Sequence, residues 1–134
     1  MNRSKINVLF FCATIIFSIF LASCAKDNPT APPPLPLPPS TTGTWSGTLS
    51  QDNVSGTLLL DLSQDVVSFI GSGELGSLTL SVVGENHYPD ISFTCSHTGY
   101  QPFTFVGTFT SPTDLSGFVN GSGFVQAVAV LTKN

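Results

Sequence analysis

Apolar and polar side chains alternate along most of residues 41–134, and this alternation limits the chain to one class of fold. In the first such segment Trp45, Gly47 and Leu49 alternate with polar neighbours, and similar segments follow to the end of the chain. A period of two residues is typical of a β-strand that buries one face, whereas no stretch has the 3.6-residue period of a helix. The predicted strands centre near residues 47, 60, 69, 80, 93, 105, 117 and 128. The sequence therefore predicts an all-β domain.

Short turn signals separate these strands at even intervals. They are Asp52-Asn53, Gln64-Asp65, Gly73 to Gly76, Glu85-Asn86, His97 to Gly99, Ser111 to Asp114 and Asn120-Gly121. Asn, Asp and Gly tolerate positive φ angles and favour tight hairpins, so each strand is predicted to pair with the next. The third strand is expected to run from Val66 to Ser72.

Eight antiparallel strands with one apolar face each can hide these faces by closing into a barrel or by stacking as two sheets. An even meander without a long returning connection favours the barrel, and closure also removes exposed sheet edges. We therefore predict a small eight-stranded antiparallel up-and-down barrel, with a β-sandwich as the alternative. Gly47, Gly71, Gly107 and Gly117 lie inside the predicted strands, where glycine permits the sharp coiling that a small barrel needs.

The N-terminus carries the features of an export signal. Arg3 and Lys5 precede an apolar run from Val8 to Leu21. A membrane-spanning helix needs about 20 apolar residues, so this run is too short for one and is typical of a secretory leader. The run ends in Leu21-Ala22-Ser23-Cys24, which resembles the lipobox of bacterial lipoproteins. The resemblance implies cleavage before Cys24, a diacylglycerol thioether on its sulfur and often an acylated amine. Two or three acyl chains hold a protein at a bilayer almost permanently.

The residues after Cys24 bear on location and spacing. In the sorting rule of such lipoproteins an aspartate after the cysteine favours the inner membrane, so Ala25 implies anchoring in the outer membrane, on its periplasmic face or at the cell surface. Seven of the ten prolines fall between Pro29 and Pro39, which predicts an extended polyproline spacer rather than a docking motif. The predicted organisation is a signal peptide over residues 1–23, the lipidated cysteine with its linker over residues 24–40, and the barrel domain over residues 41–134.

Charge and cysteine usage exclude further classes of function. Charged residues make up 9% of the chain, and after the predicted cleavage its only cations are Lys26 and Lys133. Nucleic acid binding is excluded because it needs clustered cations against phosphates. Cys12 leaves with the leader and Cys24 is blocked by lipid, so Cys95 has no disulfide partner within the chain. It alternates with apolar neighbours and is predicted to be an inert core residue.

The barrel domain also resembles a family. Gly43-Thr44-Trp45 is similar to the Gly-x-Trp opening of lipocalins and their calycin relatives, and residues 105–109 and 115–117 resemble strand pairs of small bacterial barrel lipoproteins. The resemblance implies a barrel that captures a small apolar ligand. The domain departs from lipocalins in having no helix signal and no arginine to cover the tryptophan, a place that only Lys133 can take. Trp45 is predicted to plug one end of the barrel.

The residues for catalysis or metal binding are sparse. Glu85, His87, Asp90 and His97 flank the fifth predicted strand, but the two histidines lie at its opposite ends, too far apart to share one metal ion. The chain has no Gly-x-Ser-x-Gly or Ser-x-x-Lys motif. We therefore predict a protein that is not an enzyme and has no metal site and no cofactor.

The volume of the barrel interior separates two functional hypotheses. If the glycines open space, the barrel binds a small apolar ligand inside. If the phenylalanines fill it, the barrel is a scaffold or inhibitor-type protein that acts through loops or an outer face, where Val106 and Phe118 mark a candidate apolar patch. The predicted partners are a membrane, through the lipid anchor, and either a small apolar ligand or an envelope protein. The sequence identifies no ligand-binding residues.

Overall fold

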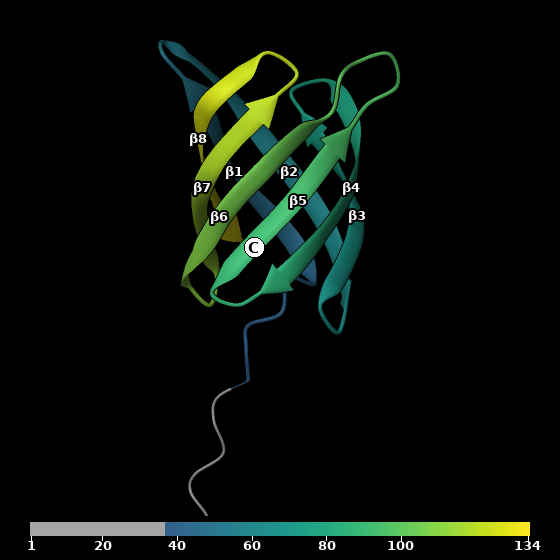
Figure 1. Ribbon diagram of the computed structural model, residues 1–134, viewed down its shortest axis with the longest axis vertical. Helices are drawn as coiled ribbons and strands as arrows, with labels where there is room; N and C mark the ends of the chain where they lie inside the picture. The colour runs from purple at the N-terminus through teal and green to yellow at the C-terminus, as the bar shows by residue number, and fades with distance from the viewer. Residues whose placement is uncertain (1–36) are drawn as a thin grey trace, which may run out of the picture. The chain divides into compact units, whose positions relative to one another are not determined.

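The computed structural model describes residues 37–134, which form a closed β-barrel of eight strands (Figure 1). Each strand pairs antiparallel with the next, and β1 pairs with β8 to close the sheet. The strands are β1 (Gly43–Gln51), β2 (Val54–Asp65), β3 (Ser68–Leu75), β4 (Leu78–His87), β5 (Asp90–Ser96), β6 (Phe103–Ser111), β7 (Asp114–Gly121) and β8 (Phe124–Lys133). The predicted up-and-down barrel is confirmed and the alternative sandwich is wrong. The predicted leader, Cys24 and most of the linker lie outside the described residues.

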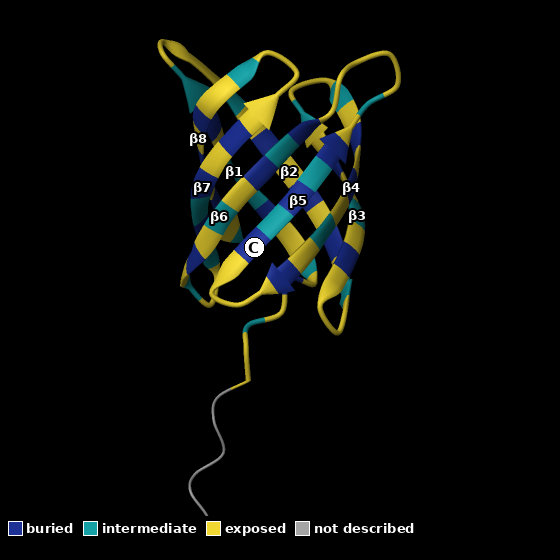
Figure 2. Ribbon diagram, viewed as in Figure 1, coloured by how far each residue is buried: buried dark blue, intermediate teal, exposed yellow. Residues whose placement is uncertain are grey.

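Burial alternates along every strand, as Figure 2 shows by its succession of buried and exposed bands. The inward-facing side chains form one apolar core that all eight strands supply. Its members are Trp45, Leu49, Leu58, Leu60, Leu62, Phe69, Leu80, Val82, Ile91, Phe93, Cys95, Phe103, Phe105, Phe109, Leu115, Val119, Ala127, Ala129 and Leu131. Among residues 37–134 no helix is long and apolar enough to cross a membrane.

Several strands extend further than the sequence predicts. Residues Gln64-Asp65, Glu85-Asn86 and Asn120-Gly121 lie in strands rather than turns, and the corresponding turns are Val66-Val67, Tyr88-Pro89 and Ser122-Gly123. Likewise β3 begins at Ser68 and continues through Gly73 to Leu75. Val66 does not open this strand, because it sits in the turn with a φ of 56°.

Two of the three shifted turns share a physical cause. Polar residues such as Gln64 and Asn86 look like turn residues in the sequence, but closure of the barrel places their side chains inside one end, where they bond to a distant segment. Val66, in contrast, is 86% exposed at its turn and adopts a backbone conformation that β-branched residues rarely take. Tertiary pairing therefore overrode the local turn preferences.

The two ends of the barrel differ in construction. At one end lie the turns β2–β3, β4–β5 and β6–β7, the segment before β1 and the C-terminal residues of β8. We call this the closed end. At the opposite end, the open end, lie the turns β1–β2, β3–β4 and β7–β8 and the longer loop 97–102 between β5 and β6 (Figure 1). The described segment before β1, residues 37–42, thus joins the barrel at its closed end.

Candidate functional site

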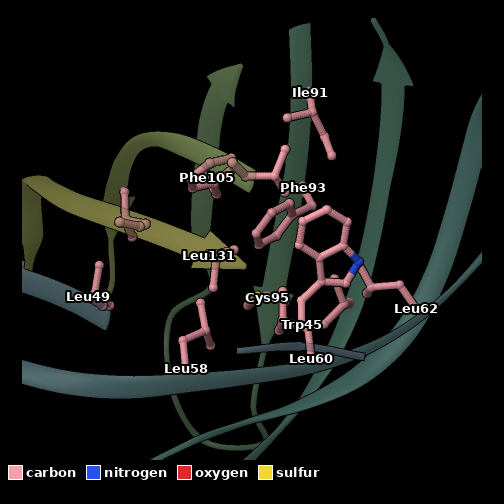
Figure 3. Packing of buried hydrophobic residues seen from close by; sticks show 14 of the residues in the cluster. Trp45, Leu49, Leu58, Leu60, Leu62, Ile91, Phe93, Cys95, Phe105 and Leu131 are labelled. Atoms are coloured by element: carbon pink, nitrogen blue, oxygen red, sulfur yellow. The ribbon is translucent and has the colours of Figure 1, made fainter. Parts of the chain in front are cut away.

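Aromatic rings fill the middle of the barrel. The ring of Phe93 stacks on that of Phe105 with centroids 4.7 Å apart, and Phe69 meets Phe93 edge-on at 6.2 Å. In Figure 3 side chains from opposite walls point toward one another across this space. An eight-stranded barrel has an interior just wide enough for side chains, so these rings leave no central channel for a ligand.

The glycines of the inner wall make room for these rings. A Cβ on Gly84 would come within 2.5 Å of both Phe69 and Phe93, and one on Gly107 or Gly117 would lie within 2.8 Å of the Phe105 ring. Real Cβ atoms do not approach other atoms so closely. Phenylalanine rings therefore occupy the space beside these glycines at the middle of the wall.

Trp45 closes one end of this packed interior. Its side chain is fully buried, and its indole Nε1–H donates a 2.7 Å hydrogen bond to the carbonyl oxygen of Thr41. The Nζ of Lys133 lies 5.8 Å from the centroid of the indole ring. Both the predicted plug and the cation over its ring are confirmed.

A short polar strap of residues 39–42 lies over Trp45 at the closed end. Gln64 Oε1 accepts hydrogen bonds from both the backbone N–H and the hydroxyl of Thr41, each at 2.8 Å, and Asn86 Nδ2 donates to the Pro39 carbonyl at 2.9 Å. Thr41 and Asn86 are buried. Local sequence patterns gave no signal for this network, because the residues that it joins are 22 to 47 positions apart.

Cys95 lies in the inner wall as predicted. It is a free cysteine with no exposed surface, and burial raises the pKa of its thiol to about 12. The thiol is therefore protonated and unreactive at neutral pH, because the thiolate is the nucleophilic form.

The residues considered for metal binding lie apart. His87 Nε2 is 3.0 Å from Glu85 Oε2 at the exposed surface of the closed end. His97 lies at the open end, where its Nδ1 donates to the Thr79 carbonyl at 2.6 Å. Within residues 37–134, no three histidine, cysteine or acidic side chains are grouped closely enough to hold a metal ion.

The open end, in contrast, is hollow and apolar. A hollow of about 410 Å³ lies between the β1–β2 and β7–β8 turns; because it is the larger of two hollows at this end, we call it the large hollow. Its lining residues are Leu49, Gln51, Asp52, Val54, Ser55, Gly56, Leu75, Ser122, Gly123 and Phe124. A small hollow of about 160 Å³ lies beside it, toward Leu80, Cys95 and the loop 97–102. Leu75, Ser122 and Phe124 line both hollows and so form the boundary between them.

This arrangement is suited to holding a small apolar molecule. Phe124 packs edge-on against Phe103 with ring centroids 5.5 Å apart, which fixes one wall. Gly56 adds no side chain on the opposite wall, and a Cβ there would meet only Leu75, at an ordinary 3.5 Å. The sequence contained a signal for this site, because Gly56 takes an inward position in an otherwise leucine-rich strand. It held no signal for which end of the barrel would be open.

The outer wall carries a second apolar feature. Val106, Phe118 and Val128 are cross-strand partners on β6, β7 and β8, and they are 58%, 49% and 44% exposed. We call this row the outer stripe. The pairing of Val106 with Phe118 on an exposed face agrees with the sequence prediction.

Comparison of the sequence with protein-family models and with curated proteins gives no match. Among solved structures, the chain is similar to a redesigned β-barrel, mFAP1, bound to DFHBI. The two share 13% sequence identity with a TM-score of 0.48, over 69% of this chain and 94% of that one. The likeness concerns the barrel architecture and carries no argument about function.

Proposed function

We propose that this protein is a lipid-anchored, non-catalytic lipoprotein of the bacterial outer membrane that binds a small apolar ligand in the large hollow at the open end of its barrel. The observation that carries the proposal is the contrast between a packed interior and an unfilled apolar hollow lined by Leu49, Leu75 and Phe124. Ligand sites are typically concave and mostly apolar, with a few polar groups at their rim.

The position of the tether supports this arrangement. The segment that leads back to Cys24 joins the barrel at the closed end, where Asn86 and Lys133 bond to the carbonyls of Pro39 and Ser40. The described segment before β1 therefore meets the barrel at the end opposite the large hollow. The predicted proline spacer supplies reach between the anchor and the barrel.

Binding is tested with the neutral probe N-phenyl-1-naphthylamine, whose fluorescence rises in an apolar site. The chain used is residues 24–134 with Cys24→Ser, which contains the whole barrel and strap. Gly56→Leu places a side chain in the large hollow and is expected to abolish most of the binding. Thr57→Leu, one residue along β2 on the exposed face, is the matched control and is expected to bind like the parent. Equal binding by both variants would contradict the proposed site.

The anchor is tested separately by labelling cells with radioactive palmitate. The wild-type protein is expected to take up label and Cys24→Ser to lose it. Persistent labelling of the variant would refute lipidation at Cys24.

Native mass spectrometry of the protein purified from its own envelope tests ligand binding in a second way. It is expected to show a bound small molecule that is lost on denaturation.

The outer stripe favours a second candidate function, an interaction scaffold. Val106, Phe118 and Val128 present an apolar row on a barrel whose interior is filled. In that case native mass spectrometry would give a bare domain together with a protein partner, and Phe118→Ser would release the partner.

A further inference from the structure

The charges of the barrel are distributed unequally between its ends. Residues 37–134 contain seven carboxylates and a single lysine or arginine, Lys133. Lys133 is at the closed end, where its ammonium lies over Trp45 and donates to the Ser40 carbonyl at 3.0 Å. Asp52, by contrast, lines the large hollow, and Glu74 lies on β3 close to the turn at the open end.

Lys133 is too distant to compensate charge at the open end. Strand β8 runs from Phe124 beside the hollow to Lys133, which is about 30 Å of extended chain at 3.3 Å per residue. The Debye length at physiological salt is about 8 Å, so the field of Lys133 is screened at the hollow. Within the described part of the chain, the rim therefore offers carboxylates and neutral polar groups and no fixed cation.

We propose that the open end selects its ligand by head-group charge: it accepts apolar molecules whose polar group is neutral or cationic, and it rejects carboxylates, phosphates and sulfonates on the same apolar body. This inference rests on the proposed function, since it concerns the ligand of the same hollow. An anionic head group would lose hydration beside Asp52 without gaining a charged partner. A cationic group would gain the attraction of Asp52 and of the net negative barrel.

A matched pair of probes tests this selection by head-group charge directly. N-phenyl-1-naphthylamine and 8-anilino-1-naphthalenesulfonate share the same ring system and differ by one sulfonate. With residues 24–134 carrying Cys24→Ser at pH 8 and low salt, we expect the neutral probe to bind about tenfold more tightly than the sulfonate. Dodecyltrimethylammonium is expected to displace the neutral probe at a lower concentration than dodecanoate, both kept below their micelle concentrations. High salt should narrow this difference.

Two lysine substitutions on one strand localise the effect. Ser55→Lys places a cation at the rim of the large hollow and is expected to tighten sulfonate binding about tenfold while changing neutral-probe binding less than twofold. Ser63→Lys makes the same charge change on the same face of β2, eight residues toward the closed end, and is expected to alter neither.

These experiments distinguish the proposed ligand site from its proposed selectivity for head-group charge. If the neutral probe binds and Gly56→Leu removes it, but the sulfonate binds equally well, charge selection is refuted and the hollow remains a ligand site. The same holds if Ser63→Lys tightens sulfonate binding as much as Ser55→Lys, because the effect then comes from net charge. If the neutral probe does not bind, both the ligand site and its selectivity are refuted.

Discussion

The closed and open ends of this barrel are made from the same strands but are packed differently. At the closed end Trp45 and the strap fill the interior, and Gln64 and Asn86 hydrogen-bond to the strap, whereas at the open end Leu75 and Phe124 are half-buried around unfilled space. The difference shows how a small barrel combines a packed interior with an unfilled hollow at one end. Packing concentrated toward one end allows the other end to remain hollow.

The largest expected effect contrasts an aromatic residue from each end. Trp45→Ala removes a fully buried ring and its bond to Thr41, and is expected to lower the free energy of unfolding by about 3–5 kcal/mol. Phe124→Ala at the open end is expected to cost about 1 kcal/mol, because only part of its ring is buried. Urea unfolding measures both free energies, and equal losses of stability in the two variants would contradict the difference in packing between the ends.

Two glycine substitutions compare the packing of the barrel interior with that of the open end. Gly84→Ala drives a methyl group against Phe69 and Phe93 and is expected to cost about 1–3 kcal/mol. Gly56→Ala meets only Leu75 at an ordinary distance, so stability is expected to stay within about 0.5 kcal/mol or to rise. Thermal unfolding of the two variants, compared with the parent, checks this. A large loss for Gly56→Ala would mean that the open end is as tightly packed as the interior.

A matched pair of glutamines tests the polar strap. Gln64→Leu removes the acceptor for the buried Thr41 N–H and hydroxyl, and is expected to cost about 1–3 kcal/mol. Gln51→Leu removes an exposed bond to the Val125 N–H at the open end and is expected to change stability by less than about 0.5 kcal/mol. Denaturant unfolding measures the free energy of unfolding of both variants. Equal values would mean that the strap does not stabilise the closed end.

The smallest expected effect is a pH dependence from the β6–β7 turn at the closed end. Hydrogen bonds from Ser111 and then Thr132 to the Asp114 carboxylate hold its pKa below the ordinary value. A lowered pKa in the folded state contributes stability that is present above the unfolded pKa, near 4, and is lost as the pH falls through the folded pKa. Asp114→Asn and Ser111→Ala are both expected to flatten the acid limb of a stability–pH curve slightly. An unchanged limb in both variants would contradict this contribution.

Much of the fold was predictable because the β-pattern is local. The eight strands, their antiparallel order and the burial of Cys95 follow from period-two alternation and short connections, and the plug at Trp45 follows from the size of its apolar ring. The turn positions at Gln64 and Asn86 were wrong because these residues have partners far along the chain. The proposed lipid anchor at Cys24 rests on the sequence alone, since it lies outside the described residues.

The alternation of apolar and polar residues is enough to require that one face of each strand be hidden, and an even meander can hide these faces by closing. The filled end, the glycines beneath aromatic rings and the place of the unfilled space depend on how the closed barrel packs. The physical reason is that closure joins β1 to β8 and brings Thr41 to Gln64 and Pro39 to Asn86. Such contacts depend on the register of the whole barrel, and no local pattern encodes that register.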